Sequence, residues 1–243
     1  MEAIKTQSLT KRYGDIVALD SLTLNVEQGE MMALLGVNGA GKTTAIKLLS
    51  CLTAPTEGEA WLCGHSILTE AQEVKRVIGV SPQETAVAKK LSVRENLQFI
   101  AEVHGAKKQE AHERVENMIE RMGLDQVSEQ RAGTLSGGWQ RRLSIAMALI
   151  GEPQILFLDE PTLGLDVLAR HELWEQIRAL KGKTTVILTT HYLEEAEVLC
   201  DRIAILAGGK LITVGTADEL KSLAGKEKFE DAFVALCAGG VQA

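Results

Sequence analysis

Residues 31–44 read MMALLGVNGAGKTT, in which a continuous apolar run passes directly into a glycine-rich segment. Five apolar residues in succession, Met31–Leu35, are typical of a strand that is buried on both faces of a sheet. The residues that follow the glycines, 42–52, predict an apolar helix. A buried strand, a glycine loop and a helix in this order indicate an α/β fold with a mostly parallel sheet.

Further patterns support this fold class. Residues 155–158 and 185–188 are two more apolar runs, and the residues between them show helical periodicity. Because buried strands separated by helices form parallel sheets, we expect helices on both faces of this one. The first thirty residues alternate between polar and apolar types and predict antiparallel strands, and residues 202–214 predict a hairpin that turns at Gly208.

The chain of 243 residues is long enough for one large domain with a smaller lobe. Residues 91–150 carry helical patterns and no convincing strand, so we expect a helical subdomain inserted into the sheet domain. The predicted layout is a nucleotide-binding core at about 1–90 and 151–220, with an antiparallel β portion, the helical subdomain at about 91–150, and a C-terminal tail at 221–243. We expect this tail to be helical from Lys221 to about Cys237.

The glycine-rich segment fits the phosphate-binding loop pattern, with four free positions between Gly36 and Gly41-Lys42-Thr43. The glycines let backbone N–H groups point at phosphate oxygens, and the following helix adds its partial positive charge. Lys42 is expected to reach the β- and γ-phosphates, and the Thr43 hydroxyl to ligate Mg²⁺. The alternative, a glycine turn with a solvated lysine, is disfavoured by the full motif between a strand and a helix. The predicted nucleotide contacts are Gly36, Val37, Asn38, Gly39, Ala40, Gly41, Lys42, Thr43 and Thr44.

Two acids follow the apolar run at 155–158. Ligands of open parallel sheets bind outside the carboxyl ends of the strands, so Asp159 suits a Mg²⁺ ligand. By strand alternation Glu160 should point the opposite way and polarise the water that attacks the γ-phosphate. His191 ends another strand at the same edge and could hold Glu160 and that water. Taken alone, Asp-Glu-Pro would be a turn and a single histidine a structural hydrogen-bonding group.

A second candidate anion site begins at residues 135–142, LSGGWQRR, which open an apolar helix. Ser136 is a suitable N-cap, and the glycines leave backbone N–H groups uncovered. Simple helix capping is the alternative. Arg141 and Arg142 lie near the positive end of the helix, against the preference of the helix dipole, so negative groups are expected to face them.

Composition limits the possible partners. The chain has 26 Lys and Arg against 33 Asp and Glu, a net charge of −7, which argues against a nucleic-acid surface. The four cysteines are scattered without metal-ligand spacing and are predicted to be structural. The sequence has no signal-peptide core and no stretch of roughly 18 apolar residues. If the protein works at a membrane, we expect another chain to span it.

The order of these motifs resembles that of the nucleotide-binding subunit of ATP-binding cassette (ABC) transporters, from about Ile4 to Leu220. The resemblance implies a P-loop NTPase core and an ATPase that uses ATP and Mg²⁺. It implies that Tyr13 stacks on adenine, that Gln83 touches Mg²⁺ and the attacking water, and that Asp166 communicates across a dimer. Ser136, Gly137, Gly138 and Gln140 would bind the γ-phosphate of ATP held by the opposite subunit. The implied catalytic residues are Lys42, Glu160 and His191, and the implied metal ligands are Thr43, Gln83 and Asp159.

The same resemblance implies two partners. One is a second nucleotide-binding subunit, with a homodimer when ATP is bound, and the other is an integral membrane permease that docks around residues 83–105. This would place the chain on the cytoplasmic face of the cell membrane. Trp139 and Val167 depart from the family pattern, in which Gln or Met and Pro are usual, but neither departure removes a functional group.

The type of transporter is a further expectation. Residues 188–205 resemble those of drug-resistance and sodium-extrusion exporters, and the short tail lacks the extra domain of sugar importers. The cargo would be a drug, an ion or a lipid-like molecule. The rival hypotheses are a soluble ABC-type clamp that acts outside transport and a phosphotransferase that uses the same loop, although the latter leaves the Ser136 segment unexplained.

Overall fold

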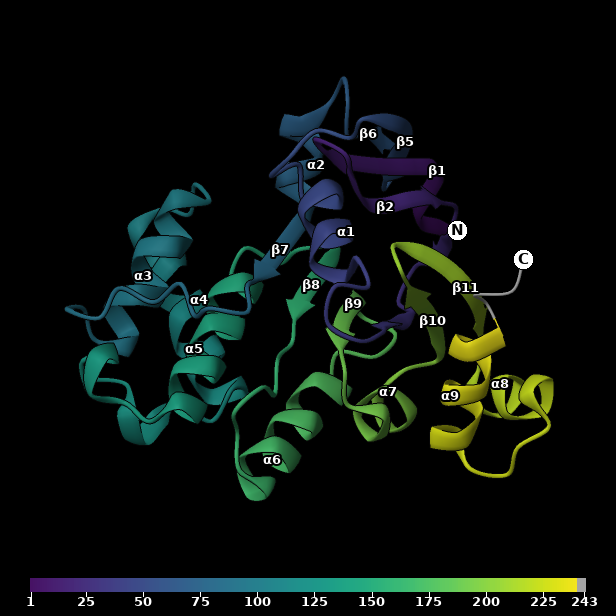
Figure 1. Cartoon of the computed structure of the whole chain (residues 1–243). Coiled ribbons are helices and arrows are strands. Elements are labelled where there is room, and N and C mark those ends of the chain that lie inside the picture. The colour runs from purple at the N-terminus through teal and green to yellow at the C-terminus, as the bar shows by residue number, and fades with distance from the viewer. Residues whose placement is uncertain (240–243) are drawn as a thin grey trace.

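The computed structural model describes residues 1–239 and contains two sheets, with helices packed around the larger one (Figure 1). The larger sheet has six strands in the order β11-β10-β4-β9-β8-β7, and all neighbours are parallel except the edge strand β11. Its strands are β4 (Met31–Leu35), β7 (Ile78–Ser81), β8 (Ile155–Asp159), β9 (Thr185–Thr190), β10 (Arg202–Ala207) and β11 (Lys210–Gly215). The predicted mostly parallel sheet and the hairpin are confirmed.

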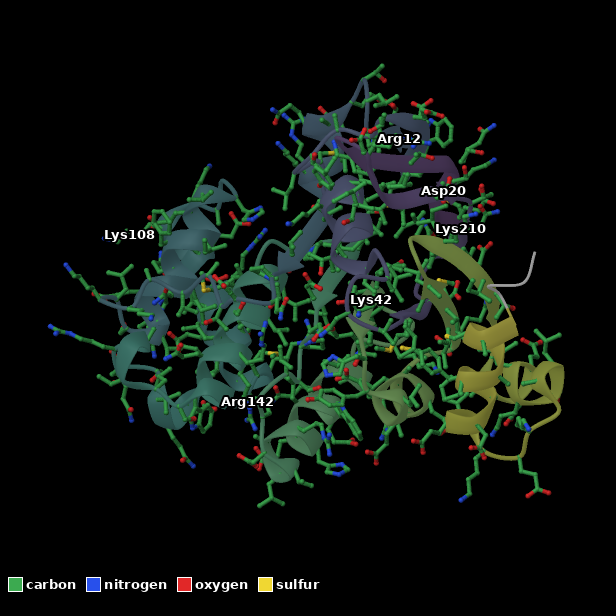
Figure 2. All side chains as sticks on the ribbon, viewed as in Figure 1. Arg12, Asp20, Lys42, Lys108, Arg142 and Lys210 are labelled. Carbon is green, nitrogen blue, oxygen red and sulfur yellow. The ribbon has the colours of Figure 1, made fainter. Side chains whose placement is uncertain are left out.

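The smaller sheet is antiparallel, with the order β2-β1-β5-β6 and with β3 paired to β1. Its strands are β1 (Glu2–Tyr13), β2 (Ile16–Leu22), β3 (Asn25–Glu27), β5 (Glu57–Leu62) and β6 (His65–Ser66). The hairpin β10–β11 ties the two sheets together, because the Asp20 N–H donates to the Gly209 carbonyl (2.8 Å). Lys210 Nζ also lies 3.6 Å from an Asp20 carboxylate oxygen, as their neighbouring positions in Figure 2 indicate.

Alternation along the central strands gives the large sheet two apolar faces. On β4, Met31, Ala33 and Leu35 belong to one core cluster, and Met32 and Leu34 belong to the other. The first face is covered by helices α5 (Gly137–Leu149), α6 (Val167–Arg178), α7 (Leu193–Leu199) and α9 (Phe229–Gly239). The second face packs against α1 (Lys42–Leu49), α2 (Ala71–Val77) and the smaller sheet. Helices therefore lie on both faces of the large sheet, as predicted. On the second face, the smaller sheet packs beside the helices.

Helices α3 (Val93–Val103), α4 (Lys108–Arg121) and α5 lie at one end of the molecule, away from the C-terminal helices (Figure 1). Ser92 starts α3 with a capping box, in which its hydroxyl accepts from the Glu95 N–H and the Glu95 carboxylate accepts from the Ser92 N–H. Two short 3₁₀ helices, Asp125–Val127 and Ala132–Thr134, connect α4 to α5. These elements fall within the stretch for which we proposed a helical subdomain.

The tail predicted to be helical from Lys221 to about Cys237 is helical except for a break between two helices. Helix α8 (Ala217–Ala224) ends where Gly225 adopts a left-handed backbone (φ +62°), and α9 begins separately at Phe229. A glycine in this conformation is a common helix C-cap, because it has no Cβ to clash. The last residues of the predicted tail, 240–243, lie outside the described part of the chain. Within that part, no helix is both long and apolar enough to cross a bilayer.

Candidate active site

One edge of the large sheet collects the predicted site residues. The glycine loop follows β4, Gln83 follows β7, Asp159 ends β8 with Glu160 directly after it, and His191 follows β9. These parallel strands are neighbours, so their carboxyl ends meet at this edge. A cleft of about 590 Å³ opens there, with Lys42 near the centre of the molecule (Figure 2). It is lined by Ile16, Val17, Ala18, Asn38, Gly39, Ala40, Gly41, Lys42, Thr43, Thr44, Gln83, Glu160, Leu163 and His191.

The glycine loop has little room for side chains. A Cβ on Gly36 would lie 2.4 Å from the Leu206 carbonyl oxygen, so only glycine fits. Gly41 has φ +100°, and a Cβ there would lie 2.7 Å from the Ala18 carbonyl oxygen. Lys42 is only 5% exposed, and its Nζ donates to the Gly36 carbonyl at 2.7 Å. The loop thus holds a buried ammonium group beside the cleft, where this group can pair with phosphate oxygens.

Asp159 is buried at the end of β8 beside the start of α1. Its Oδ1 accepts hydrogen bonds from the Thr43 hydroxyl, at 3.2 Å, and from the Thr189 hydroxyl. Thr189 was not singled out from the sequence, because a threonine within a strand has no distinguishing pattern. It orients the carboxylate that was expected to ligate Mg²⁺.

Glu160 reaches the cleft by a different route from the one expected. Strand β8 ends at Asp159, and Glu160 has a left-handed backbone with φ +48°, so strand alternation does not determine its direction. Its N–H bonds the Thr189 carbonyl at 3.1 Å and the Thr189 hydroxyl at 3.0 Å. Its carboxylate lies 2.9 Å from His191 Nδ1 and 3.6 Å from Lys42 Nζ. Lys42, Glu160 and His191 therefore form one continuous cluster.

The second candidate anion site lies elsewhere in the chain. Ser136 occupies the N-cap position of α5, but its side chain makes no capping hydrogen bond, so simple capping does not account for it. Gly138 packs against α6, since a Cβ there would lie 3.5 Å from Ala169 Cβ. Asp166 caps α6 by accepting from the Ala169 N–H at 3.0 Å. Ser136, Gly137, Gly138, Gln140 and Asp166 are not among the described residues that line the cleft.

Tyr13 lies at the rim of the site. It is 49% exposed at the turn of the β1–β2 hairpin and is paired with Ile16, which lines the cleft. Lys11 Nζ stands 5.1 Å from the centroid of its ring. The ring is thus available for stacking from solvent, although Tyr13 itself is not a lining residue.

The two arginines of α5 have different partners. Arg142 pairs with the Glu172 carboxylate, so the predicted negative partner is confirmed for this arginine. Arg141 is 5% exposed and donates instead to the backbone carbonyls of Pro82, at 2.6 Å, and of Gln83. Burial lowers the pKa of the Arg141 guanidinium, and the negative charge of Asp159 partly offsets this. Arg141 therefore ties α5 to the segment that carries Gln83.

Comparison with known proteins identifies the family. A family model described as ABC transporter matches residues 19–163, more than half of the chain. The chain belongs to the ABC transporter family. It is 43% identical over 229 residues to the daunorubicin resistance ATP-binding protein DrrA3 of Streptomyces coeruleorubidus, covering 94% of this chain and 72% of that protein. It is also 44% identical over 214 residues to the Nod factor export ATP-binding protein I of Burkholderia thailandensis, covering 87% of this chain and 70% of the relative.

Solved ABC cassettes share the fold over most of this chain. An ATP-binding subunit of an ABC transporter superposes with a TM-score of 0.86 at 30% identity and covers 96% of this chain and 99% of its own. The cassette MJ0796, solved as a dimer in a post-hydrolysis state with ADP and Pi, superposes with a TM-score of 0.79 at 28% identity. It covers 88% of this chain and 98% of its own. This ABC protein is accordingly an ATP-binding subunit and an ATPase, of the type found in exporters.

Proposed function

We propose that this ABC subunit binds Mg-ATP in the cleft and that its hydrolysis powers export through a separate membrane permease. The contact of Lys42, Glu160 and His191 within the cleft carries this proposal. Lys42 stabilises charge on the β- and γ-phosphates, and Glu160 accepts a proton from the attacking water while His191 fixes its carboxylate. Tyr13 stacks on the adenine at the rim.

The residues around Thr43 fit a magnesium ion. Mg²⁺ prefers oxygen ligands in an octahedron at 2.0–2.1 Å, so that adjacent ligands lie about 3 Å apart. The Thr43 hydroxyl and an Asp159 carboxylate oxygen are 3.2 Å apart, and Gln83 lines the same cleft. We assign these three residues to the metal. When bound, the ion would neutralise phosphate charge, which is the chemistry that phosphoryl transfer requires.

A second copy of the chain would complete the site. The uncapped hydroxyl of Ser136 and the N–H groups at the start of α5 form an anion-binding helix end outside the cleft. Exposed apolar side chains lie in or near both the glycine loop and the Ser136 segment. Val37, in the glycine loop, is 58% exposed, and Leu168, at the start of α6, is 76% exposed. We propose a head-to-tail homodimer in which the Ser136 segment of one chain meets the γ-phosphate held by the other.

The permease would dock beside Gln83. An apolar cleft of about 390 Å³ lies there, lined in part by Leu52, Pro82, Ile100 and Met147. Val103, on the neighbouring turn of α3, is 65% exposed. Exposed apolar surface of this kind is typical of a protein interface, so we propose that this surface holds the chain at the cytoplasmic face of the membrane. The net charge of −7 disfavours nucleic acid as the partner.

The relatives indicate the class of cargo. Their names refer to resistance to daunorubicin and doxorubicin and to export of Nod factor, and we propose a drug-like, lipid-like or ionic substrate for this chain. A soluble clamp is the alternative function. Co-purification of the tagged chain from detergent extracts with a membrane-spanning protein is the expected result, whereas recovery with ribosomes or DNA would support the clamp.

Replacement of Glu160 by Gln tests the chemistry. Glu160→Gln keeps the shape of the side chain and removes the base, so we expect ATP hydrolysis to fall by about 10²-fold or more while ATP binding is retained. The variant should also accumulate as an ATP-bound dimer. Hydrolysis would be measured by phosphate release, binding by a fluorescent ATP analogue and dimerisation by size-exclusion chromatography. Near-normal turnover would remove Glu160 from the mechanism.

A further inference from the structure

A carboxyl group outside the cleft joins the two segments that carry Glu160 and His191. Glu195 lies on α7, four residues after His191, and is 0% exposed. Its Oε1 accepts a hydrogen bond from the Thr162 hydroxyl at 2.8 Å and another from Trp174 Nε1 at 3.1 Å. Thr162 is two residues after Glu160 and is 1% exposed.

Packing alone does not explain a carboxyl group at this position. Burial raises the pKa of Glu195, and the hydrogen bonds from Thr162 and Trp174, together with the charge of Arg170, only partly offset this. Its Oε2 has no hydrogen-bond partner among the described residues. An apolar side chain of similar volume would avoid this desolvation cost but would leave the buried Thr162 and Trp174 donors unpaired, so the carboxyl group serves to connect the segments that carry these donors.

The hydrogen-bond pattern shows what the Thr162 link holds. The Leu163 N–H donates to the Glu160 carbonyl at 3.2 Å, and the Leu165 N–H donates to the Thr162 carbonyl at 3.1 Å. Thr162 thus lies inside the tight turn that begins at Glu160, whose left-handed backbone depends on its surroundings. The Thr162–Glu195 bond is a second connection between the same two segments that the Glu160–His191 contact joins.

We propose that Glu195 is a positioning residue which, through Thr162, fixes the Glu160 carboxylate against His191. This inference rests on the proposed role of Glu160 in hydrolysis. Trp174 donates a hydrogen bond to the same Glu195 oxygen, but it belongs to α6 and is not part of the turn that begins at Glu160. The two donors to Glu195 therefore provide a matched comparison.

The experiment measures ATP hydrolysis by the purified chain, well below the lowest unfolding temperature of the variants. Thr162→Val removes one donor and Trp174→Phe removes the other, and each leaves one hydrogen bond to Glu195. Misplacement of a catalytic group lowers turnover, so we expect Thr162→Val to lower kcat by about tenfold with the KM for ATP changed less than about twofold. Trp174→Phe should keep kcat within about twofold of the unmodified chain. Thr162→Ser retains the hydroxyl group that donates to Glu195 and should do the same.

A second pair of variants tests Glu195 directly. Glu195→Gln keeps an acceptor oxygen and should retain kcat, whereas Glu195→Met removes it and should reproduce the loss seen in Thr162→Val. Equal kcat for Thr162→Val and Trp174→Phe, whether both are normal or both are reduced, would overturn the proposal and leave Glu195 a structural group. Glu160→Gln serves as the separate control, because normal hydrolysis by that variant would refute the proposed role of Glu160, on which this inference rests, whatever the result for Thr162.

Discussion

Arg141 offers a prediction whose size follows from the structure. Arg141→Met keeps most of the side-chain volume and removes the guanidinium that donates to the Pro82 and Gln83 carbonyls. Hydrogen bonds from a charged donor are worth about 1.5–3 kcal/mol each, and the desolvation of the buried cation offsets part of this, so we expect a net loss of about 2 kcal/mol. Unfolding entropy is about 2.1 cal/mol/K per residue, or about 0.5 kcal/mol/K for 243 residues, so Tm should fall by about 4 °C.

Arg141→Met should also lower the turnover of protein that remains fully folded. Without Arg141 the backbone at Gln83 is no longer held against α5, so Gln83 loses its fixed position in the cleft. We expect kcat to fall by about tenfold at a temperature where the variant is fully folded. Differential scanning fluorimetry would give Tm, and steady-state phosphate release would give kcat and KM.

Arg142→Met is the matched control. Arg142 pairs with Glu172, whose side chain is 64% exposed, and a pair with a partner this exposed is worth about 0–1 kcal/mol. Tm should therefore fall by no more than about 2 °C, and kcat should change by less than about twofold. Equal losses of kcat in the two variants would refute the reasoning, because Arg142 does not touch the Gln83 segment.

Two other predictions follow from the site. Ser136→Ala should leave Tm within about 1 °C, because the hydroxyl makes no capping bond, yet it should weaken ATP-dependent dimerisation measured by light scattering. A drop in Tm of several degrees would instead indicate a structural role for Ser136. Chelation of Mg²⁺ with EDTA should abolish ATP hydrolysis. It should leave the Tm measured without nucleotide unchanged, because the Thr43 and Thr189 hydroxyls already satisfy the Asp159 carboxylate when no metal is bound. Hydrolysis that persists in EDTA would contradict the assigned metal ligands.

The sequence predicts the centre of the fold well, for a physical reason. Strands β4, β8 and β9 are buried on both faces, so each appears as a continuous apolar run. Strand β7 was missed because it has only four residues and contains Gly79. A Cβ at Gly79 would lie 2.1 Å from the Ala148 carbonyl oxygen, so the glycine reflects close packing against α5, which no local pattern reveals.

Residues 57–66 and 71–77 also show no clear pattern of either structure in the sequence. Strand β5 and helix α2 mix polar and apolar residues, and few of their side chains are buried. Their positions depend on pairing with β1 and on packing against β7, which are contacts between distant parts of the chain. Local periodicity does not report such contacts, and tertiary context decides them.

The site was predictable where a motif fixes the backbone. The glycine loop, Glu160 and His191 line one cleft, as their positions after apolar strands indicated. Gln83 lines the same cleft, but only the family resemblance pointed to it, because the strand before it has no clear sequence pattern. The residues that orient them, Thr189, Arg141 and Glu195, were not recognised as functional. Their roles arise from hydrogen bonds to atoms far away in sequence, and threonine, arginine and glutamate at such positions have many ordinary explanations.

Because Glu160 has a left-handed backbone, the residue that would make the protein most stable at this position differs from the residue that hydrolysis requires. A side chain with a Cβ is disfavoured at φ +48°, where glycine and asparagine are tolerated best. Mutants chosen only for surviving high temperature would therefore tend to replace the glutamate with those residues and relax the turn. Variants selected for ATP turnover would keep the strained glutamate. Selection for stability and selection for turnover would therefore favour different residues at position 160.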